Sequence, residues 1–216
     1  MIISKQKSVS SILELIKKGP VFIIGCNQCA TLCHSGGETE VLEMRKIIEN
    51  HNVTVTGWII LDPACHLLNS KRVLKSVKQE IDTSNYLLVL SCGNGVQVIK
   101  ELFPEKTTVS GTNTMFLGAE TKRGVFTREC NLCGSCIVDE FEGFCPVSRC
   151  PKQMLNGPCG GSMNGKCELD ANLDCVWDAI IKKRMRNPKK SVNRLIIPPK
   201  DWTDYKLYNW RNNETI

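Results

Sequence analysis

Short, continuously apolar runs alternate with amphipathic segments along the first half of the chain. Such runs are typical of strands buried on both faces, and they predict strands at 21–25, 53–61 and 86–90, with a weaker one near 107–109. Helical periodicity predicts helices at 8–18, 38–50, 64–81 and 95–102. In the first helix, Ser11 and Glu14 have the spacing of a capping box. Because strands alternate with helices, the pattern predicts an α/β fold: an N-terminal open parallel sheet with flanking helices.

The regular periodicity ends at about residue 126, where cysteine, glycine and proline become frequent. Bound metal, in place of a large apolar core, organises folds of this composition. We therefore expect an α/β domain at 1–125 and a small, irregular cysteine-rich metal-cluster domain at 126–186, with a final helix at about 175–185. A basic and aromatic tail occupies 187–216. Its basic residues are typical of a solvated end, whereas its aromatic residues favour docking onto another protein.

No segment of the 216-residue chain approaches the ~18 consecutive apolar residues of a membrane span. The first apolar stretch is interrupted by Glu14 and followed by Lys17 and Lys18, so we expect no signal peptide and a cytoplasmic protein. In a reducing cytoplasm the 13 cysteines favour metal binding over disulfides. Two oxidised iron–sulfur cubes would lower the formal charge from +6 to about +2, so the charge does not indicate nucleic-acid binding.

Five cysteines directly follow the predicted strands. Cys26, Cys29 and Cys33 form a C-x2-C-x3-C pattern after the first strand, Cys65 follows the second and Cys92 follows the third. The carboxyl ends of parallel strands share one edge of a sheet, where ligands bind. Three close thiols and one distant thiol fit a single 4Fe–4S cluster, with Cys92 or Cys65 as the fourth ligand. The alternative for Cys65 is a buried, inert thiol.

Glycine and histidine residues accompany these thiols. Gly36 and Gly37 would let backbone amides approach cluster sulfurs, and Gly93 would do the same after the third strand. His34 and His66 each adjoin a cysteine, so a mixed Cys/His zinc site is an alternative. A histidine in this position also suits a hydrogen-bonding role beside a ligand.

The other eight cysteines begin with a tight C-x2-C-x2-C triple, Cys130, Cys133 and Cys136. Three thiols at this spacing fit three corners of a 4Fe–4S cube, whereas a zinc knuckle takes two close ligands. The remaining thiols are those of Cys145, Cys150, Cys159, Cys167 and Cys175. Eight thiols suffice for two four-ligand sites, but the spacing leaves their pairing open, and a four-cysteine zinc site is the alternative. Gly160 and Gly161 would let amides reach the sulfurs.

Four motifs carry a family resemblance: CPVSRCPK at 145–152, LNGPCGG at 155–161, GCNQCATLCHSGGETEV at 25–41 and SCGNGVQV at 91–98. The cysteine-rich segment 130–177 resembles the methylenetetrahydrofolate reductase C-terminal domain family. Residues 5–185 as a whole are similar to the small iron–sulfur subunit of the acetogen-type methylenetetrahydrofolate reductase.

The resemblance implies a chain that binds iron–sulfur clusters and partners a flavin-dependent (β/α)8 catalytic subunit. That subunit reduces methylenetetrahydrofolate to methyltetrahydrofolate in the reductive acetyl-CoA pathway. The resemblance also implies an external electron source, such as a further flavin or iron–sulfur subunit. The chain itself has no flavin motif or folate pocket, and Val98 stands where a dinucleotide fingerprint beginning at Gly93 would place its last glycine.

We therefore expect an electron-transfer and assembly subunit of an oxidoreductase complex, without catalytic residues of its own. It would carry two or three 4Fe–4S clusters, with zinc at one site as a variant, and no flavin. One alternative is a zinc-stabilised structural subunit without a redox role. Another is direct handling of a folate or corrinoid by the α/β domain, against which the five cysteines at the sheet edge argue.

Overall fold

The computed structural model describes residues 1–17, 19–186, 196–203 and 205. The chain forms two compact units. Unit 1 comprises Met1–Phe116 and Glu120–Phe126, and unit 2 comprises Leu117–Ala119 and Thr127–Ile216. Most of the predicted tail at 187–216 lies outside the described residues.

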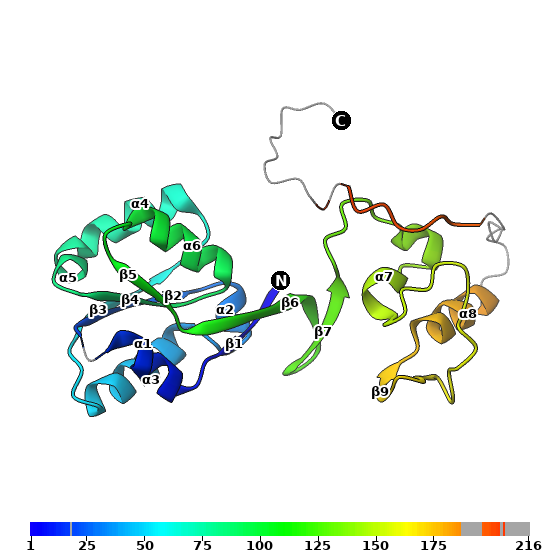
Figure 1. Cartoon of the computed structure of the whole chain (residues 1–216), viewed down its shortest axis with the longest axis horizontal. Coiled ribbons are helices and arrows are strands. Elements are labelled where there is room, and N and C mark those ends of the chain that lie inside the picture. The colour runs from blue at the N-terminus through cyan, green and yellow to red at the C-terminus, as the bar shows by residue number, and fades with distance from the viewer. Residues whose placement is uncertain (18, 187–195, 204, 206–216) are drawn as a thin grey trace. The chain divides into compact units, whose positions relative to one another are not determined.

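A four-stranded parallel sheet forms the centre of unit 1 (Figure 1). Its strands are β2 (Val21–Cys26), β3 (Val55–Leu61), β4 (Tyr86–Leu90) and β5 (Thr107–Ser110), in the order β3-β2-β4-β5. The pairings β2 with β3, β2 with β4 and β4 with β5 are all parallel. The predicted α/β fold with an open parallel sheet is therefore confirmed.

Helices cover both faces of this sheet, as Figure 1 shows. One face packs against α1 (Val9–Ile16) and α3 (Glu38–Asn50), and the other against α2 (Cys29–Leu32), α4 (Leu67–Leu74), α5 (Lys78–Asp82) and α6 (Gly93–Leu102). Because successive strand residues point to opposite faces, Val21 and Ile23 enter the first layer and Phe22 and Ile24 enter the second. All four side chains are fully buried, which explains the continuously apolar run.

Two predicted helices differ in detail from the structure. The expected helix at 64–81 is divided into α4 and α5 by a 3-10 turn, Lys75–Val77. The N-cap of α1 is Ser8, whose hydroxyl accepts a hydrogen bond from the Ser11 amide at 3.3 Å. The predicted capping box from Ser11 to Glu14 is therefore wrong, because Ser11 already lies inside the helix.

A second, three-stranded sheet was not predicted. It consists of β1 (Ile2–Gln6), β6 (Thr112–Lys122) and β7 (Val125–Cys130), in the order β1-β6-β7. Most residues of β6 and β7 are exposed or half-buried. They therefore lack the apolar run that identified the buried strands.

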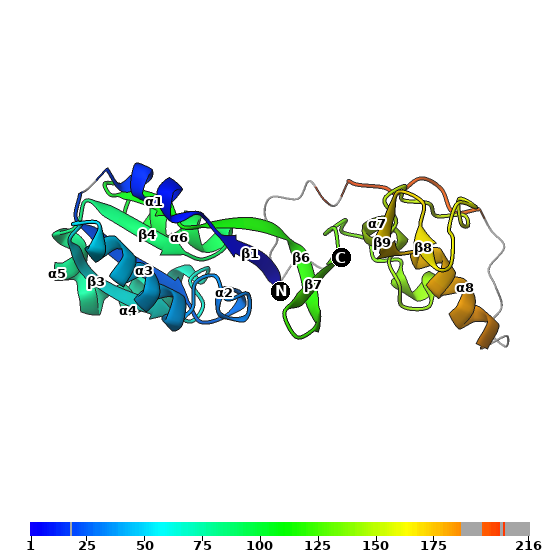
Figure 2. The same ribbon diagram turned by 90° about the horizontal axis from the view of Figure 1, so that it is seen from below.

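Unit 2 is built from short elements. They are a 3-10 helix (Val138–Phe141), α7 (Pro146–Arg149), β8 (Lys166–Cys167), β9 (Asp170–Asp174) and α8 (Val176–Arg186) (Figure 2). The final helix, α8, confirms the helix predicted at about 175–185. Among the described residues, the core cluster of this unit contains the buried side chains of Phe141, Val176, Trp177 and Ile180. The Phe141 and Trp177 rings meet edge to face with centroids 5.6 Å apart.

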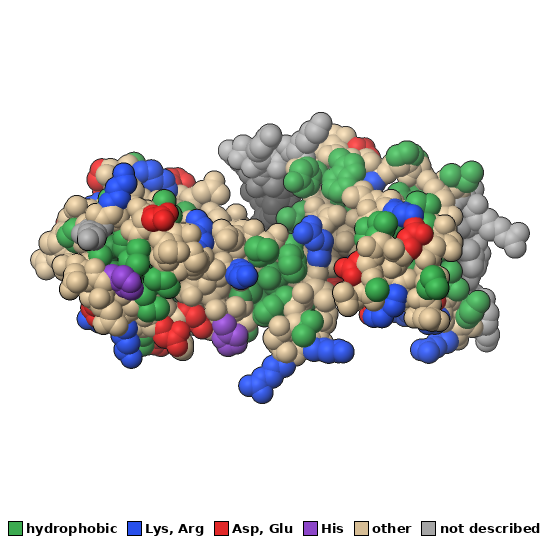
Figure 3. Space-filling model, turned by 60° about the horizontal axis from the view of Figure 1, so that its bottom comes forward, with side chains coloured by type: hydrophobic (Ala, Val, Ile, Leu, Met, Phe, Trp, Pro, Cys, Tyr) green, Lys and Arg blue, Asp and Glu red, His purple; other side chains and the backbone are tan. Residues whose placement is uncertain are grey.

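The surface that Figure 3 shows carries lysine and arginine side chains interspersed with aspartate and glutamate side chains. Within the described ranges, none of the helices is long and apolar enough to span a membrane.

Gly36 is required by close packing at the end of β4. A Cβ atom there would lie 1.8 Å from the backbone oxygen of Leu90, so Gly36→Ala must displace the backbone. We expect it to lower the free energy of unfolding by roughly 2–3 kcal/mol, measured by urea denaturation. Gly93→Ala is the matched control, because its Cβ would meet only the Thr114 hydroxyl oxygen, at 3.4 Å. Equal stability of the two variants would contradict this packing argument.

Candidate metal-binding sites

The first candidate site lies at the carboxyl ends of β2 and β4, whose connections to the next strands pass over opposite faces of the sheet. β2 lies between β3 and β4, and after the short helix α2 the connection from β2 to β3 passes through α3 on one face of the sheet. The chain leaves β4 toward α6 on the opposite face. Such a divergence opens a crevice at the carboxyl ends of the strands, which is where ligands bind in open α/β sheets. Cys26 ends β2, and Cys92 follows β4 as the N-cap of α6.

Four thiols gather at this edge of the sheet. Burial raises the pKa of the Cys65 thiol, and repulsion from ionised Cys92, Cys26 and Cys29 raises it further. Because solvent screens such repulsion over about 10 Å, the loop after β3 brings Cys65 into the neighbourhood of the thiols that follow β2 and β4. The sequence left Cys65 and Cys92 as alternatives for a fourth ligand, whereas the fold brings both toward Cys26 and Cys29.

Polar side chains tie the two loops together. The Gln28 side-chain amide donates a hydrogen bond to the Asp62 carboxylate, which joins the loop after β2 to the loop after β3. The Asn69 side-chain amide donates to the Asp62 carbonyl at 3.0 Å, and the Ser70 hydroxyl donates to the Ala64 carbonyl at 3.2 Å. These contacts position Cys65, and no local sequence pattern predicted them because Gln28 and Asp62 are 34 residues apart.

Cys33 faces a different set of groups. Its thiol donates to the Ile2 carbonyl at 3.7 Å. Burial raises its pKa, while hydrogen bonds from Ser4 lower it and the nearby Cys29 raises it. Strand β1 thus lies along the cysteine loop, and the Ile2 amide donates to the Cys29 sulfur at 3.4 Å. Cys33 therefore lies near Cys29, and its hydrogen-bond partners belong to β1.

The glycine amides near this edge already have acceptors. The Gly37 amide donates to the Glu40 carboxylate at 2.8 Å, and the Gly93 amide donates to the Thr114 hydroxyl at 2.8 Å. Gly36 instead allows the close approach to β4 described above. For the amides of Gly37 and Gly93 to donate to cluster sulfurs as predicted, they would have to release Glu40 and Thr114.

The two histidines beside these cysteines have local partners. His66 is the N-cap of α4, where its Nδ1 accepts from the Asn69 amide at 3.1 Å. His34 Nδ1 lies 3.6 Å from the Glu40 carboxylate. Each contact involves the Nδ1 atom of the imidazole ring.

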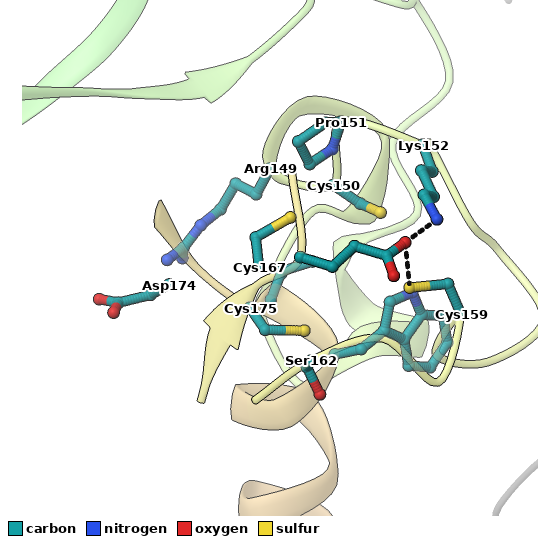
Figure 4. Close-up of a pocket in the computed structure, with 12 residues that line it drawn as sticks. Arg149, Cys150, Pro151, Lys152, Cys159, Ser162, Cys167, Asp174 and Cys175 are labelled. Carbon is teal, nitrogen blue, oxygen red and sulfur yellow. Dashed lines mark hydrogen bonds and ion pairs between the residues drawn. The ribbon is translucent and has the colours of Figure 1, made fainter. Parts of the chain in front are cut away.

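Unit 2 contains a pocket surrounded by four thiols, as Figure 4 shows. They belong to Cys150 after α7, Cys159 in the glycine-rich loop, Cys167 in β8 and Cys175 before α8. The enclosed space is about 20 Å³. The sequence left the pairing of the eight C-terminal cysteines open, and the fold gathers these four.

A carboxylate lies among these thiols. Glu168 receives a hydrogen bond from the Cys159 thiol at 3.6 Å and pairs with the Lys152 ammonium. Figure 4 draws these contacts as dashed lines from Cys159 and Lys152. A Cβ atom at Gly161 would collide with this carboxylate, whereas one at Gly160 would have open space around it. The pair of Glu168 with Lys152 was not predicted from the sequence. The local signal that could have indicated it is that Glu168 directly follows Cys167 and Lys152 directly follows Pro151.

The tight triple lies on the loop after β7. The backbone amide of Leu132 donates to the Cys130 sulfur at 3.3 Å, and both Leu132 and Gly134 have positive φ angles, 56° and 82°. This turn directs a backbone amide at a thiol, as in sites that bind a metal through C-x2-C loops.

The same loop is fastened to α7, whose N-cap is Cys145. The Asn131 side-chain amide donates to the Val147 carbonyl at 3.0 Å, and the Ser148 hydroxyl donates to the Glu129 carbonyl at 2.8 Å. These bonds hold the residues around Cys130 beside the helix that Cys145 begins. The other four cysteines of unit 2 line the pocket, so Cys145 is the remaining thiol of this unit.

All 13 cysteines are free thiols. Across the described ranges, no group of three or more His, Cys, Asp or Glu side chains is arranged as it stands to hold a metal ion. Metal binding therefore requires the thiols to turn toward a common centre. The donor chemistry fits iron–sulfur clusters or zinc, since both take sets of four thiolates.

The fold and the thiols define a cysteine-rich α/β protein whose second unit has a small apolar core. Residues 109–203 match the family model described as methylene-tetrahydrofolate reductase C terminal. The match covers less than half of the chain but includes all eight cysteines of unit 2, and it relates this segment to methylenetetrahydrofolate reductase. None of the curated proteins and none of the solved structures matches the chain.

The proximity of Cys65 and Cys92 predicts a change in thiol reactivity. In the reduced, metal-free chain, Cys92→Ser removes the repulsion that raises the pKa of Cys65. We expect iodoacetamide to alkylate Cys65 roughly twofold faster at pH 8, measured by peptide mass spectrometry. Cys133→Ser in unit 2 is the matched control. An unchanged rate in the Cys92 variant would mean that these two thiols are not neighbours.

Proposed function

We propose that the chain is an iron–sulfur electron-transfer and assembly subunit of a methylenetetrahydrofolate reductase complex. The observation that carries this proposal is the gathering of Cys26, Cys29, Cys65 and Cys92 at the divergence between β2 and β4. The family match of residues 109–203 supports the connection with methylenetetrahydrofolate reductase. We propose a cytoplasmic location because thiols of this kind stay reduced there.

The first 4Fe–4S cluster would be bound by those four cysteines. Thiolates of an iron–sulfur site are stabilised by backbone amides, and the Ile2 amide already donates to the Cys29 sulfur at 3.4 Å. The ties from Gln28 and Asn69 to Asp62 would limit how far the Cys65 loop can move. Cys33 would lie outside the ligand set, because its thiol faces β1.

The second cluster would be bound by Cys130, Cys133, Cys136 and Cys145. The support for it is the close triple, the amide of Leu132 directed at the Cys130 sulfur, and the bonds that fasten this loop to α7. A cluster of this kind supplies one-electron transfer, while the surrounding chain sets its potential and position.

The partner would be a flavin-dependent (β/α)8 subunit that makes methyltetrahydrofolate. Electrons would reach the flavin of that subunit from the clusters, and a further flavin or iron–sulfur subunit would supply them. This chain would bind neither flavin nor folate, and its role would be to position one-electron carriers.

A second candidate function is that of a zinc-stabilised structural subunit without a redox role. The observation in its favour is the narrow four-thiol pocket of unit 2, whose enclosed space is only about 20 Å³. This pocket does not decide the role of the thiols at the sheet edge in unit 1.

Metal analysis of the anaerobically purified full chain tests the proposal. We expect about eight iron atoms and eight acid-labile sulfides per chain, and an absorption near 400 nm that bleaches with dithionite. A colourless chain with zinc and no sulfide would reject the redox role and favour the structural subunit.

Single substitutions distinguish the ligands proposed for unit 1. Cys65→Ser should remove about four iron atoms and four sulfides per chain, because a cube loses one of its four ligands. Cys33→Ser is the matched control and should keep the full iron content, since its thiol donates to the Ile2 carbonyl. The measurement is iron and sulfide content together with the electron paramagnetic resonance spectrum of the reduced chain. The reverse pattern, with iron lost only in the Cys33 variant, would reject this ligand set.

A further inference from the structure

The pocket of unit 2 differs in kind from the other thiol groups. Its four cysteines come from four separate segments, with seven or eight residues between successive thiols, and none belongs to a C-x2-C loop. We propose that Cys150, Cys159, Cys167 and Cys175 form a mononuclear site for a soft divalent cation, zinc. The site would exist alongside the clusters proposed above, and its assignment does not depend on them.

The size of the pocket is the first argument. The enclosed space of about 20 Å³ is little more than the ~10–15 Å³ that one water molecule needs. A single cation fits such a space once the thiols turn toward it. A cube would place four irons and four sulfides inside the same ring of thiols, which requires the surrounding segments to move apart.

The position of the pocket against the core is the second argument. Cys150 and Cys175 pack against the cluster formed by Phe141, Val176, Trp177 and Ile180. The Trp177 indole donates to the Met154 carbonyl at 2.9 Å and lines the same pocket. Among the described residues, this cluster of four buried side chains is small for a unit of this length. One ion bound by four segments would therefore supply stability that apolar burial does not.

Zinc binding would change the charge and the hydrogen bonds at the pocket. Zinc with four thiolates carries a net charge of about −2, and binding releases the four thiol protons to solvent. Two cationic side chains, Lys152 and Arg149, line the pocket together with two carboxylates, Glu168 and Asp174. The Cys159 thiol donates a hydrogen bond to Glu168, which also pairs with Lys152. Cation binding would therefore break the bond from Cys159 and move the Glu168 carboxylate away from the thiols, toward Lys152.

A pair of variants of the full chain tests this assignment. Each protein is given one equivalent of Zn²⁺ and desalted, and then zinc and iron are measured. We expect about one zinc per wild-type chain, loss of zinc with unchanged iron in Cys159→Ser, and unchanged zinc in the matched control Cys133→Ser. Loss of about four irons from the Cys159 variant, or zinc uptake equal to that of the wild type, would overturn the assignment.

X-ray absorption at the zinc edge provides a second measurement that iron does not obscure. The wild-type chain should show four sulfur neighbours at about 2.3 Å, and Cys167→Ser should show three or no bound zinc. Zinc with nitrogen or oxygen as the main neighbours in the wild type would reject the site. A chain that binds zinc in this way but contains no iron would leave the assignment standing and reject the redox function.

Discussion

The position of the thiols in unit 1 depends on the crevice between the carboxyl ends of β2 and β4, from which the connections cross to opposite faces of the sheet. The two strands are parallel neighbours, so their carboxyl ends meet at one edge, and the connections that leave them pass through α3 on one face of the sheet and α6 on the other. The loops that leave them must then stand on either side of a crevice. Cys26 and Cys92 are held at that crevice by buried strands rather than by each other. The apolar packing of residues such as Ile23 and Leu88 therefore fixes where thiol chemistry can occur.

Unit 2 differs from unit 1 in how little apolar core its described residues form. Its described core cluster is small, and its cysteine-bearing segments are short turns that do not pack extensively by themselves. Hydrogen bonds from Asn131 and Ser148 fasten one loop to α7, and the four pocket thiols line the same pocket as Val176 and Trp177 at the start of α8. Under our proposals, metal ligands replace apolar contacts as the source of order in this unit. Redox chemistry and structural support would then come from separate sets of cysteines in the same unit.

The apolar pattern predicted the buried parts of the fold well. Strands β2 and β4 and helix α3 fall where the sequence placed them, because buried residues leave a strong periodic signal. The signal failed at β1, β6 and β7, which are largely half-exposed, and at the turn that separates α4 from α5. For the cysteines, the sequence identified the thiols and their chemistry but could not group them. The tie between Gln28 and Asp62 and the pair of Glu168 with Lys152 join segments that carry no shared local pattern.

The sequence by itself determined the α/β class of unit 1 and the presence of 13 thiols suited to soft metals. Both follow from local properties, since periodicity reports burial and residue type reports donor chemistry. Only the tertiary structure decided which thiols are neighbours. It brought Cys65 and Cys92 together with Cys26 and Cys29, turned Cys33 toward β1, and gathered Cys150, Cys159, Cys167 and Cys175 around one pocket. The physical reason is that strand order and loop path decide which residues far apart in the sequence come close in space. The spacing of cysteines along the chain carries no information about either.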